Sequence, residues 1–444
     1  MYLSEHYSYR KLLKFTLPTI FVMVFTSIYG IVDGFFLSNF GGKIPFAAVN
    51  FIMPVLMILS SLGFMMGTGS SALIGRTLGE NKPQRARSQF NSLFATTVLL
   101  SAAAACLGLL FLPSVLHLMG CTETMMPYAR DYGTIILCFL PFYMIQMYFQ
   151  AVFVTAWHPK ASFLVTVAGG LVNVVLDTIF IGILGWGAAG AAAATGLGQL
   201  TAAVLSVLCF VKKRGTLYFS SFRFCIKDIF QAASNGISEL LSNAAASLIS
   251  VLYNFQLLRF VGEEGVAACG TLMYVAMIFM AISIGYGMGA GPLISYQYGA
   301  DNKAELASLT KKSVVIITIG SAVMFALAEL LAQPLAHMFA GYDAQLMAVT
   351  IQAFRICSPV FLFSGFAVFG SGFFTALNNG PVSALISVIR TMGFQVGFIL
   401  VFPLLWGQEG IWFSMVAAEF MAMIISGLLL WGFRKRYGYF PVRM

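Results

Sequence analysis

The sequence predicts an all-α polytopic membrane protein in which twelve transmembrane helices form two pseudo-symmetric six-helix bundles. Of its 444 residues, 59% are hydrophobic and only 9% are charged, which is far less charge than a soluble protein of this size carries. Twelve apolar segments of about 20 residues or more follow one another, and this is the length that a helix needs to cross a bilayer. Short motifs of the first half also recur at a constant offset in the second half, which indicates an internal repeat.

Each apolar segment is expected to be one membrane-crossing helix, because a helix satisfies its own backbone hydrogen bonds in lipid. The segments are too long for the alternating strands of an outer-membrane barrel. Pro18 and Pro54 each remove a backbone hydrogen bond, so we expect bends near the start of the first helix and inside the second. The expected helices lie at 12–37, 46–75, 89–112, 128–152, 160–184, 188–211, 230–258, 264–294, 311–333, 346–374, 381–404 and 410–433.

The distribution of positive charge predicts the orientation in the membrane. Lys and Arg gather at both ends of the chain and after the second, sixth and eighth helices, whereas the opposite connections hold little beyond Lys43, Arg130 and Arg259. By the positive-inside rule both termini are cytoplasmic, as an even number of helices requires. The net charge of +9 therefore reflects topology and contact with anionic lipid. No compact basic patch with interleaved aromatic residues predicts nucleic-acid binding.

The internal repeat divides the chain into two halves. Because each half has an even number of helices, both halves enter the membrane in the same sense, and an axis along the membrane normal should relate them. We expect an N-terminal bundle at 1–211, a cytoplasmic linker at 212–227 and a C-terminal bundle at 228–444. A substrate cavity between the bundles is expected to open alternately to each side. The recurring positions, all separated by the same offset, include Gly67 and Gly287, Gly79 and Gly299, Phe153 and Phe373, Thr155 and Thr375, and Trp186 and Trp406.

Acidic side chains within the apolar segments are the first candidates for function. A carboxylate near the middle of a bilayer costs on the order of a few kcal/mol, and it usually marks an ion or substrate path. Asp177 and Asn173 are the only strongly polar residues of segment 171–183. They are four residues apart, so one helix face carries an amide oxygen next to a carboxylate. This pattern outlines an oxygen-rich cation site.

Asp33 and Thr195, in the first and sixth helices, complete the candidate cation site with Asn173 and Asp177. Two carboxylates, an amide oxygen and a hydroxyl are hard ligands that suit Na⁺ or a shared proton. Two acids that lie close together in a low dielectric cannot both stay ionised without a cation. The alternative is that each polar group only caps or hydrogen-bonds a helix.

A second polar group is expected in the C-terminal half. Arg390 is the only basic residue of its helix, so an acidic partner is nearly obligatory, and Glu239 and Glu419 are the candidates. Structural neutralisation and substrate recognition both remain open as roles for this group. Further candidates for a substrate cavity or for this polar network are Asn243, Tyr253 and Asn254.

The motifs of the fifth and sixth helices resemble those of a known family. Asn173-Val-Val-Leu-Asp177, followed by Gly185-Trp-Gly-Ala-Ala-Gly190, is similar to the helix 5–6 signature of the MATE (multidrug and toxic compound extrusion) family. Val32-Asp33-Gly34 resembles the acidic first helix of that family, and the likeness, which extends along essentially the whole chain, is strongest to its MepA-like bacterial branch. The resemblance implies a cation site formed by Asp33, Asn173, Asp177, the Ala191 carbonyl and Thr195.

We therefore predict a secondary antiporter of the bacterial cytoplasmic membrane that exports organic compounds, cationic or amphipathic, in exchange for Na⁺ or H⁺. It is expected to be a monomer whose partners are a small organic substrate and the lipid bilayer. The seven cysteines and four histidines are scattered without metal-binding spacing, so no cofactor is expected besides the coupling ion.

Two other functions are alternatives to the antiporter. A flippase for lipid-linked precursors needs cationic side chains in its cavity to hold pyrophosphate, and only Arg355 and Arg390 qualify. An enzyme has little support, because the sequence contains no HExxH or GxSxG motif and no paired His and acid.

Overall fold

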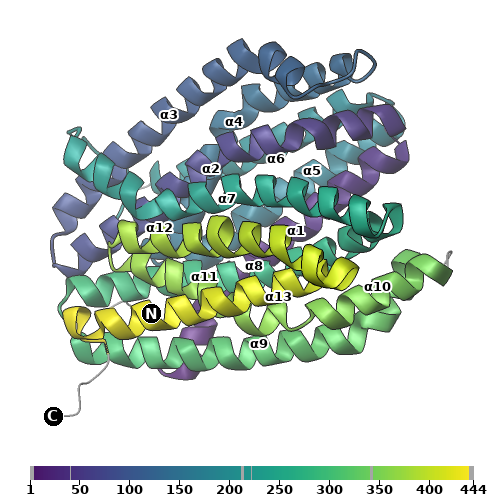
Figure 1. Ribbon diagram of the computed structural model, residues 1–444. Helices are drawn as coiled ribbons and strands as arrows, with labels where there is room; N and C mark the ends of the chain where they lie inside the picture. Colours follow the sequence, from purple (N-terminus) through teal and green to yellow (C-terminus); the bar gives the residue numbers. More distant parts are fainter. Residues whose placement is uncertain (1–4, 41, 212–214, 222, 341–343, 440–444) are drawn as a thin grey trace.

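The computed structural model describes residues 5–40, 42–211, 215–221, 223–340 and 344–439, and the regular structure within these ranges is entirely helical (Figure 1). The first half contains α1 (Tyr9–Phe40), α2 (Lys43–Gly79), α3 (Pro83–Leu118), α4 (Met126–Thr155), α5 (Pro159–Asp177), the π-helix η1 (Thr178–Ile183) and α6 (Gly187–Val211). The second half contains α7 (Ile226–Phe260), α8 (Glu263–Gly299), α9 (Lys303–Ala340), α10 (Ala344–Cys357), α11 (Val360–Ala376), α12 (Gly380–Val388), the π-helix η2 (Ile389–Gln395) and α13 (Val396–Tyr437).

These helices provide twelve membrane crossings. Ten helical stretches of the described residues are long and apolar enough to cross a bilayer, and α10 with α11, bent by 50°, supplies an eleventh. One of the ten, Gly380–Tyr437, has 58 residues, more than twice the roughly 20 that one crossing needs. The backbone of Gly407 is not helical, with φ 59° and ψ −136°, and it divides this stretch into two crossings. The predicted all-α fold with twelve transmembrane helices is confirmed.

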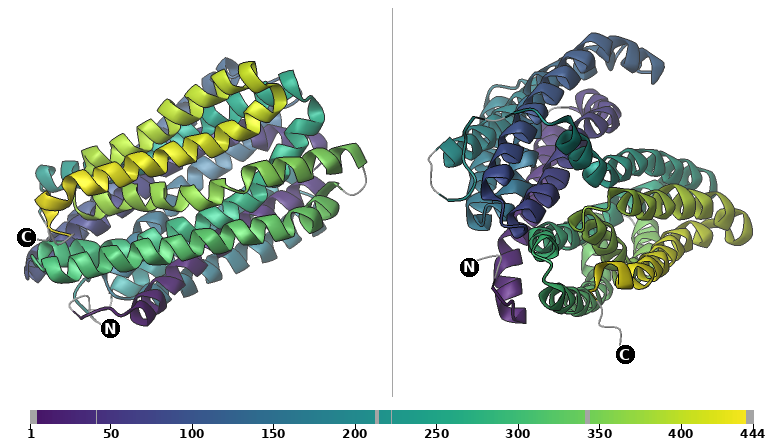
Figure 2. Two further views of the ribbon diagram at one scale, coloured as in Figure 1. Left: turned by 60° about the horizontal axis from the view of Figure 1, so that its bottom comes forward. Right: turned by 90° about the vertical axis from the view of Figure 1, so that its left-hand side faces the viewer.

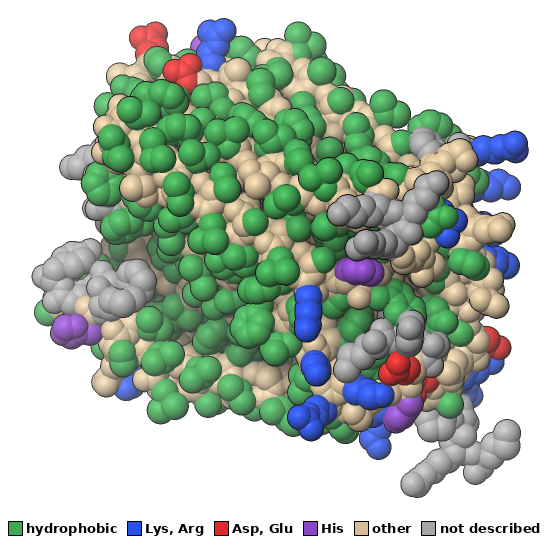
Figure 3. All heavy atoms as spheres, turned by 180° about the vertical axis from the view of Figure 1, so that it is seen from behind, with side chains coloured by type: hydrophobic (Ala, Val, Ile, Leu, Met, Phe, Trp, Pro, Cys, Tyr) green, Lys and Arg blue, Asp and Glu red, His purple; other side chains and the backbone are tan. Residues whose placement is uncertain are grey.

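The surface of the described residues fits a bilayer. Apolar side chains cover most of the face shown in Figure 3, and Lys and Arg gather toward one end of the molecule. This end carries the connections that follow α2 and α8 and the last turn of α13, where Arg434, Lys435 and Arg436 lie. We call it the basic end; it is the end that the charge distribution predicts to be cytoplasmic.

Turns at the basic end show the internal repeat in the backbone. Asn81 and Asp301, with φ of 58° and 51°, are separated by the same offset as the repeated motifs of the sequence. Trp157 and Asn378 form a second pair of left-handed turn residues, with φ of 71° and 56°. Their separation is longer than the offset of the motifs by a single position. The repeat is thus preserved in the fold, and the left-handed residue of the second turn lies one residue later in the second half.

The two halves pack as two bodies that meet along α1, α2, α7 and α8 (Figure 2). Close contact at the basic end depends on glycine. A Cβ at Gly69 of α2 would lie only 1.8 Å from the carbonyl oxygen of Ala232 in α7. A Cβ at Gly79, at the end of α2, would lie 2.0 Å from the carbonyl oxygen of Tyr296 in α8. Only glycine lets these backbones approach so closely, as in other membrane helix pairs.

Glycines of α8 also allow close contact with α1. A Cβ at Gly289 of α8 would lie 2.9 Å from the Cα of Thr16 in α1, and one at Gly285 would lie 2.6 Å from the Cα of Ile20. Extending this antiparallel register would bring Gly34 of α1 beside Gly270 of α8. A Cβ on either of these glycines would find no atom within 4 Å. The close glycine contacts between α1 and α8 thus lie at Gly285 and Gly289, toward the basic end.

Residues 5–8, here called the N-terminal arm, tie the start of α1 to α9 in the other half. The Tyr7 backbone N–H donates to Glu305 Oε1 at 2.9 Å, and His6 Nδ1 lies 2.6 Å from Glu305 Oε2. Lys312 donates a hydrogen bond to the Tyr7 carbonyl. The Tyr7 ring is fully buried in a cluster with residues of α1, α4, α8 and α9. The arm thus spans the line along which the halves meet at the basic end.

Candidate cation and substrate sites

Four of the predicted cation-site residues come together in the first half. Asp33 lies on α1, Asn173 and Asp177 on α5, and Thr195 on α6. Thr195 Oγ1 donates to Asp33 Oδ1 at 3.3 Å, and Asn173 Nδ2 donates to Thr195 Oγ1 at 3.4 Å. The carboxyl groups of Asp33 and Asp177 interact electrostatically with each other. Ala191, also predicted, is fully buried one helical turn before Thr195.

Small residues let the helices of this cluster approach one another. A Cβ at Gly198 of α6 would lie 3.0 Å from the Cβ of Asn173. A Cβ at Gly170 of α5 would lie 2.5 Å from the ring of Phe25 on α1. Because α1, α5 and α6 pack so closely, polar groups that are distant in sequence share one interior site.

The oxygens of this cluster have few partners within the protein. Asp177 is fully buried, and neither of its carboxylate oxygens has a hydrogen-bond partner among the described residues. The same holds for Oδ1 of Asn173, which is 2% exposed. A buried polar atom without a partner is unfavourable by about 1–3 kcal/mol, and more if it is charged. Unpaired oxygens grouped in this way fit a small cation or a proton as their missing partner.

The donor set differs from that of a transition-metal site. The described residues contain no group of three or more His, Cys, Asp or Glu side chains that could hold a metal ion. Two carboxylates, an amide and a hydroxyl are instead hard oxygen donors, which favour a proton or an alkali cation over softer metals.

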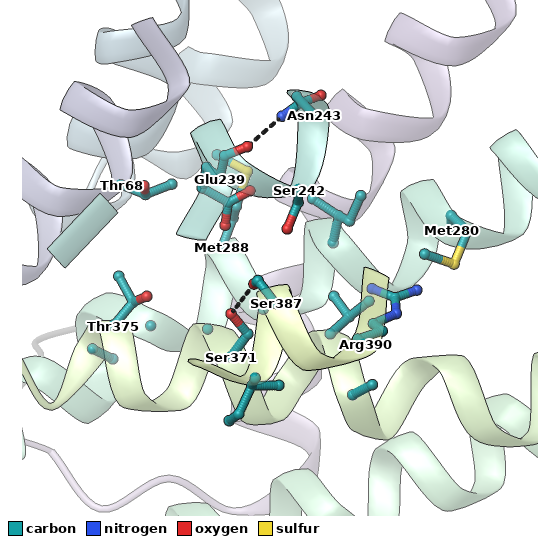
Figure 4. Close-up of a pocket in the computed structure, with 18 of the residues that line it drawn as sticks. Thr68, Glu239, Ser242, Asn243, Met280, Met288, Ser371, Thr375, Ser387 and Arg390 are labelled. Carbon is teal, nitrogen blue, oxygen red and sulfur yellow. Dashed lines mark hydrogen bonds between the residues drawn. The ribbon is translucent and has the colours of Figure 1, made fainter. Parts of the chain in front are cut away.

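A second polar region lies in a cavity of about 320 Å³ between the halves (Figure 4). Its wall comes mostly from α7, α8, α11, α12 and η2, and α2 and α4 of the first half contribute the remainder. In Figure 4, Glu239 lies near Ser242 and Met288, and Arg390 lies toward the other side of the cavity. The volume falls within the range of roughly 300–1,000 Å³ that is typical of pockets for small organic ligands.

Arg390 is paired with the carboxylate of Glu419 from its own half. Its Nε donates to both carboxylate oxygens of Glu419, at 3.0 and 3.1 Å, and its Nη2 lies 2.9 Å from Glu419 Oε1. Gln395 Nε2 donates to the same carboxylate at 2.9 Å. Glu419 is only 3% exposed, so the carboxylate of this bidentate ion pair is shielded from water.

The other predicted residues of the second half have separate positions. Glu239 and Asn243 line the cavity, and Asn243 Nδ2 donates to the backbone carbonyl of Glu239 at 2.8 Å. Tyr253 is buried and its hydroxyl lies 3.1 Å from Ser414 Oγ. Asn254 is exposed. Neither Tyr253 nor Asn254 belongs to the cavity wall.

Sequence reasoning missed a cluster of hydroxyl groups on the cavity wall. Ser371 Oγ lies 2.9 Å from Ser383 Oγ and 3.2 Å from Ser387 Oγ, and Thr375 Oγ1 lies 2.8 Å from Ser383 Oγ. The signal was present as serine and threonine four residues apart within apolar helices. This spacing places hydroxyls on one helix face.

Both π-helices lie beside charged residues. Asp177 is the last α-helical residue before η1, and Arg390 is the second residue of η2. A π-turn loosens the regular backbone hydrogen bonding and is often found at functional sites. The sequence contains no proline within either turn that would have indicated it.

Comparison with known proteins then identifies the family. The MatE family model matches residues 18–179 and 217–401. The chain belongs to the MatE family. It is therefore a membrane transporter of a multidrug efflux family and not an enzyme, as the sequence predicted. Its many apolar helices make it a multi-pass membrane protein.

Individual relatives match over most of their length. The multidrug export protein MepA of Staphylococcus saprophyticus subsp. saprophyticus is 22% identical over 442 residues, which cover 98% of this chain and 96% of the relative. The FAD transporter of Shewanella oneidensis is 24% identical over 338 residues, which cover 74% of each chain. A solved structure of a multidrug resistance MATE family transporter in an outward-facing conformation matches with a TM-score of 0.91 at 23% identity, covering 98% of this chain and 97% of that one.

Proposed function

We propose that this MATE protein is a cation-coupled antiporter that exports organic compounds, cationic or amphipathic, by alternating access. The observation that carries the proposal is the buried group of oxygens around Asp177, whose carboxylate has no hydrogen-bond partner among the described residues. A proton or Na⁺ bound between Asp177 and Asp33 would supply the missing partner. The names of the MepA relatives support export of drugs as the transport activity.

Helix α1 provides a physical link between the ion site and the contact between the halves. It carries Asp33 in its second part, and in its first part Thr16 and Ile20 pack against Gly289 and Gly285 of α8. An ion that changes the position of Asp33 can therefore shift the contact that closes the basic end. Coupling requires only that ion and exported compound favour different conformations of the two bundles.

The orientation and assembly that we propose follow the charge distribution. With both termini cytoplasmic, the basic end faces the cytoplasm, and the opposite end faces the outside of the bacterial cytoplasmic membrane. Each chain contains a complete set of the proposed ion and substrate residues, so we propose that the monomer is the transporting unit.

The flippase alternative needs cationic side chains that are free to hold pyrophosphate. The charge of Arg390 is neutralised by its ion pair with Glu419. Arg355, the other candidate, is exposed and lies outside the wall of the cavity. These positions favour the antiporter over the flippase.

Asp177→Asn tests the ion site. The substitution keeps the size of the side chain but removes the negative charge, so gradient-driven export should fall to the level of membranes that lack the protein. The measurement is ethidium efflux from cells or inverted vesicles with Na⁺ and pH gradients imposed separately, which also identifies the coupling ion. The control is Thr178→Val, at an exposed position next to Asp177. Efflux at the wild-type rate in Asp177→Asn, with both proteins inserted equally, would remove the coupling role.

A further inference from the structure

We propose that the carbonyl of Ala72 and the side chains of Ser295 and Asn378 form a gate between the cavity and the basic end, here called the floor gate. The two side chains belong to the second half and bind one carbonyl of the first, so the halves separate at this position only when both hydrogen bonds break. The proposal rests on alternating access as the transport mechanism. It assigns the contact that has to open before a compound enters from the cytoplasm.

Two side chains of the second half share the carbonyl oxygen of Ala72 in α2. Ser295 Oγ of α8 donates one hydrogen bond to it, and Asn378 Nδ2, in the turn between α11 and α12, donates the other at 3.1 Å. Asn235 Nδ2 of α7 donates to Asn378 Oδ1 at 2.7 Å, which holds the Asn378 amide in this orientation. Ser295 is fully buried and Asn235 is 2% exposed, so water competes little for these bonds.

The floor gate lies directly beyond the cavity on its basic side. Ala72 is itself the wall residue of α2 that is nearest the basic end. On α8 the corresponding wall residue is Pro292, and Ser295 lies within one helical turn after it. On α11 it is Ala376, and Asn378 lies in the turn that follows. Because all three helices run toward the basic end, the floor gate separates the cavity from that end.

Glycine in α2 allows Ser295 to reach the carbonyl. A Cβ at Gly75, one helical turn after Ala72, would lie 2.9 Å from Ser295 Oγ and 3.2 Å from Ser295 Cβ. Any larger residue at position 75 would therefore push the hydroxyl away from its acceptor. The close approach of α2 and α8 thus continues from the end of α2 up to the cavity.

The floor gate can open without leaving a polar group unpaired. A helical carbonyl accepts one backbone bond and has a second lone pair, so the carbonyl of Ala72 keeps a partner when both side chains leave. The Ser295 hydroxyl can turn to a carbonyl of its own helix. Asn378 retains its bonds to Asn235 and to the Ala376 carbonyl, the latter at 3.3 Å. The contact closes the floor and is released at low cost, as a gate requires.

The internal repeat contains a related contact of different chemistry. Trp157 is the left-handed turn residue of the first half that is paired with Asn378. Its ring packs edge-on against Tyr296 of α8, with ring centroids 6.4 Å apart. Each half therefore sends one turn residue to the other half. The residue from the first half makes an aromatic contact, and the one from the second half makes a hydrogen bond at the cavity wall.

Ser295→Ala tests the floor gate through a reporter cysteine on the cavity wall. The reporter is Ala246→Cys in a variant that lacks the native cysteines, labelled by a membrane-impermeant thiol reagent from the cytoplasmic side of inverted vesicles. Loss of one hydrogen bond between the halves should increase the population that is open at the basic end. The labelling rate should then rise about fivefold. Labelling from the outside, in right-side-out vesicles, should not rise.

The matched control is Ser414→Ala. Ser414 is also fully buried, but its hydroxyl bonds to Tyr253 and to the Ile411 carbonyl inside the second half, so cytoplasmic labelling should stay at the wild-type rate. Equal cytoplasmic labelling in Ser295→Ala and wild type would overturn the proposal. An equal rise in Ser414→Ala, or a rise from both sides of the membrane, would overturn it as well, because either result indicates a general loosening of the fold.

Asn378→Gly is the second variant, which replaces Ser295→Ala if that protein does not fold. Asn378 has φ 56°, and glycine adopts this left-handed conformation readily while removing the other hydrogen bond to Ala72. Labelling should again rise from the cytoplasmic side alone, and an unchanged rate would contradict the proposal.

The labelling experiment needs neither an ion gradient nor an exported compound. A protein whose floor gate responds as expected, but whose Asp177→Asn variant exports at the wild-type rate, would keep the gate and lose the proposed ion coupling. The opposite pair of results would keep the ion coupling and remove the gate. Failure of one proposal is therefore distinguishable from failure of the other.

Discussion

At the scale of single residues, charged groups of the membrane interior differ mainly in their partners. Neither carboxylate oxygen of Asp177 has a hydrogen-bond partner among the described residues, and the charged group that it faces is a second acid, Asp33, whereas Arg390 and Glu419 satisfy each other. The sequence predicts these residues as special because a charge among apolar neighbours is conspicuous. It does not predict which acid pairs with Arg390, because that depends on how α13 packs against η2. The Ser371 cluster was missed for another reason: most membrane hydroxyls bond to their own helix, as Thr310 does.

The pairing of Arg390 has a measurable consequence for stability. Glu419→Ala leaves a buried guanidinium without its counter-charge, which should reduce the free energy of unfolding by about 3–5 kcal/mol. Replacing both partners by methionine removes both charges at similar volume and should restore most of that stability. Thermal unfolding of the purified variants measures the difference. A double variant as unstable as Glu419→Ala would show that the pair does more than neutralise charge.

At the scale of helices, the apolar segments predict where the crossings lie better than where the helices end. The first crossing was expected at 12–37, and α1 extends over Tyr9–Phe40. Helices continue past the apolar segment because polar residues also form helix where the backbone reaches water. The break at Gly407 falls between the expected crossings 381–404 and 410–433, whereas the two π-helices were not predicted. They depend on how neighbouring helices pack, and hydrophobicity along the chain does not report that packing.

Gly69 provides a test of the close contact between α2 and α7. A Cβ there would collide with backbone at 1.8 Å, so Gly69→Ala should push the helices apart and weaken closure of the basic end. The readout is Ser70→Cys in a variant that lacks the native cysteines, because Ser70 is fully buried. In the presence of Gly69→Ala, this cysteine should react faster with a thiol reagent added from the cytoplasmic side. The control is Gly320→Ala in α9, where a Cβ meets open space and helix stability should rise by roughly 0.5–1 kcal/mol. Unchanged labelling in Gly69→Ala would indicate that the contact is not needed for closure.

At the scale of the whole molecule, closure of the basic end depends on contacts between parts that are far apart in the chain. The N-terminal arm joins the start of the first half to Glu305 and Lys312 of the second. This contact cannot be predicted from the sequence, because a tyrosine before the first helix is usually a surface residue. The cavity between the halves was expected from the internal repeat, but the identity of its walls required the fold.

Tyr7→Ala tests the contact between the N-terminal arm and α9. Removing a fully buried aromatic ring should favour conformations open at the basic end and shift the distribution of spin-label distances between the two halves on that side. Tyr9→Ala is the matched control, since Tyr9 is 43% exposed and its removal should change little. Identical distance distributions for Tyr7→Ala and wild type would mean that the helix contacts alone hold this end closed.

The separate apolar cores have a consequence for biosynthesis. Except for Leu217 and Ala232, the buried residues of the two core clusters of the first half all precede the end of α6. The first bundle can therefore complete its packing in the membrane while the ribosome is still translating the second. The contacts that Tyr7, Gly69 and Gly79 make with the second half form only after α7, α8 and α9 have been synthesised. Assembly then proceeds in the order of synthesis, which limits the time during which unpaired helices are exposed to wrong partners.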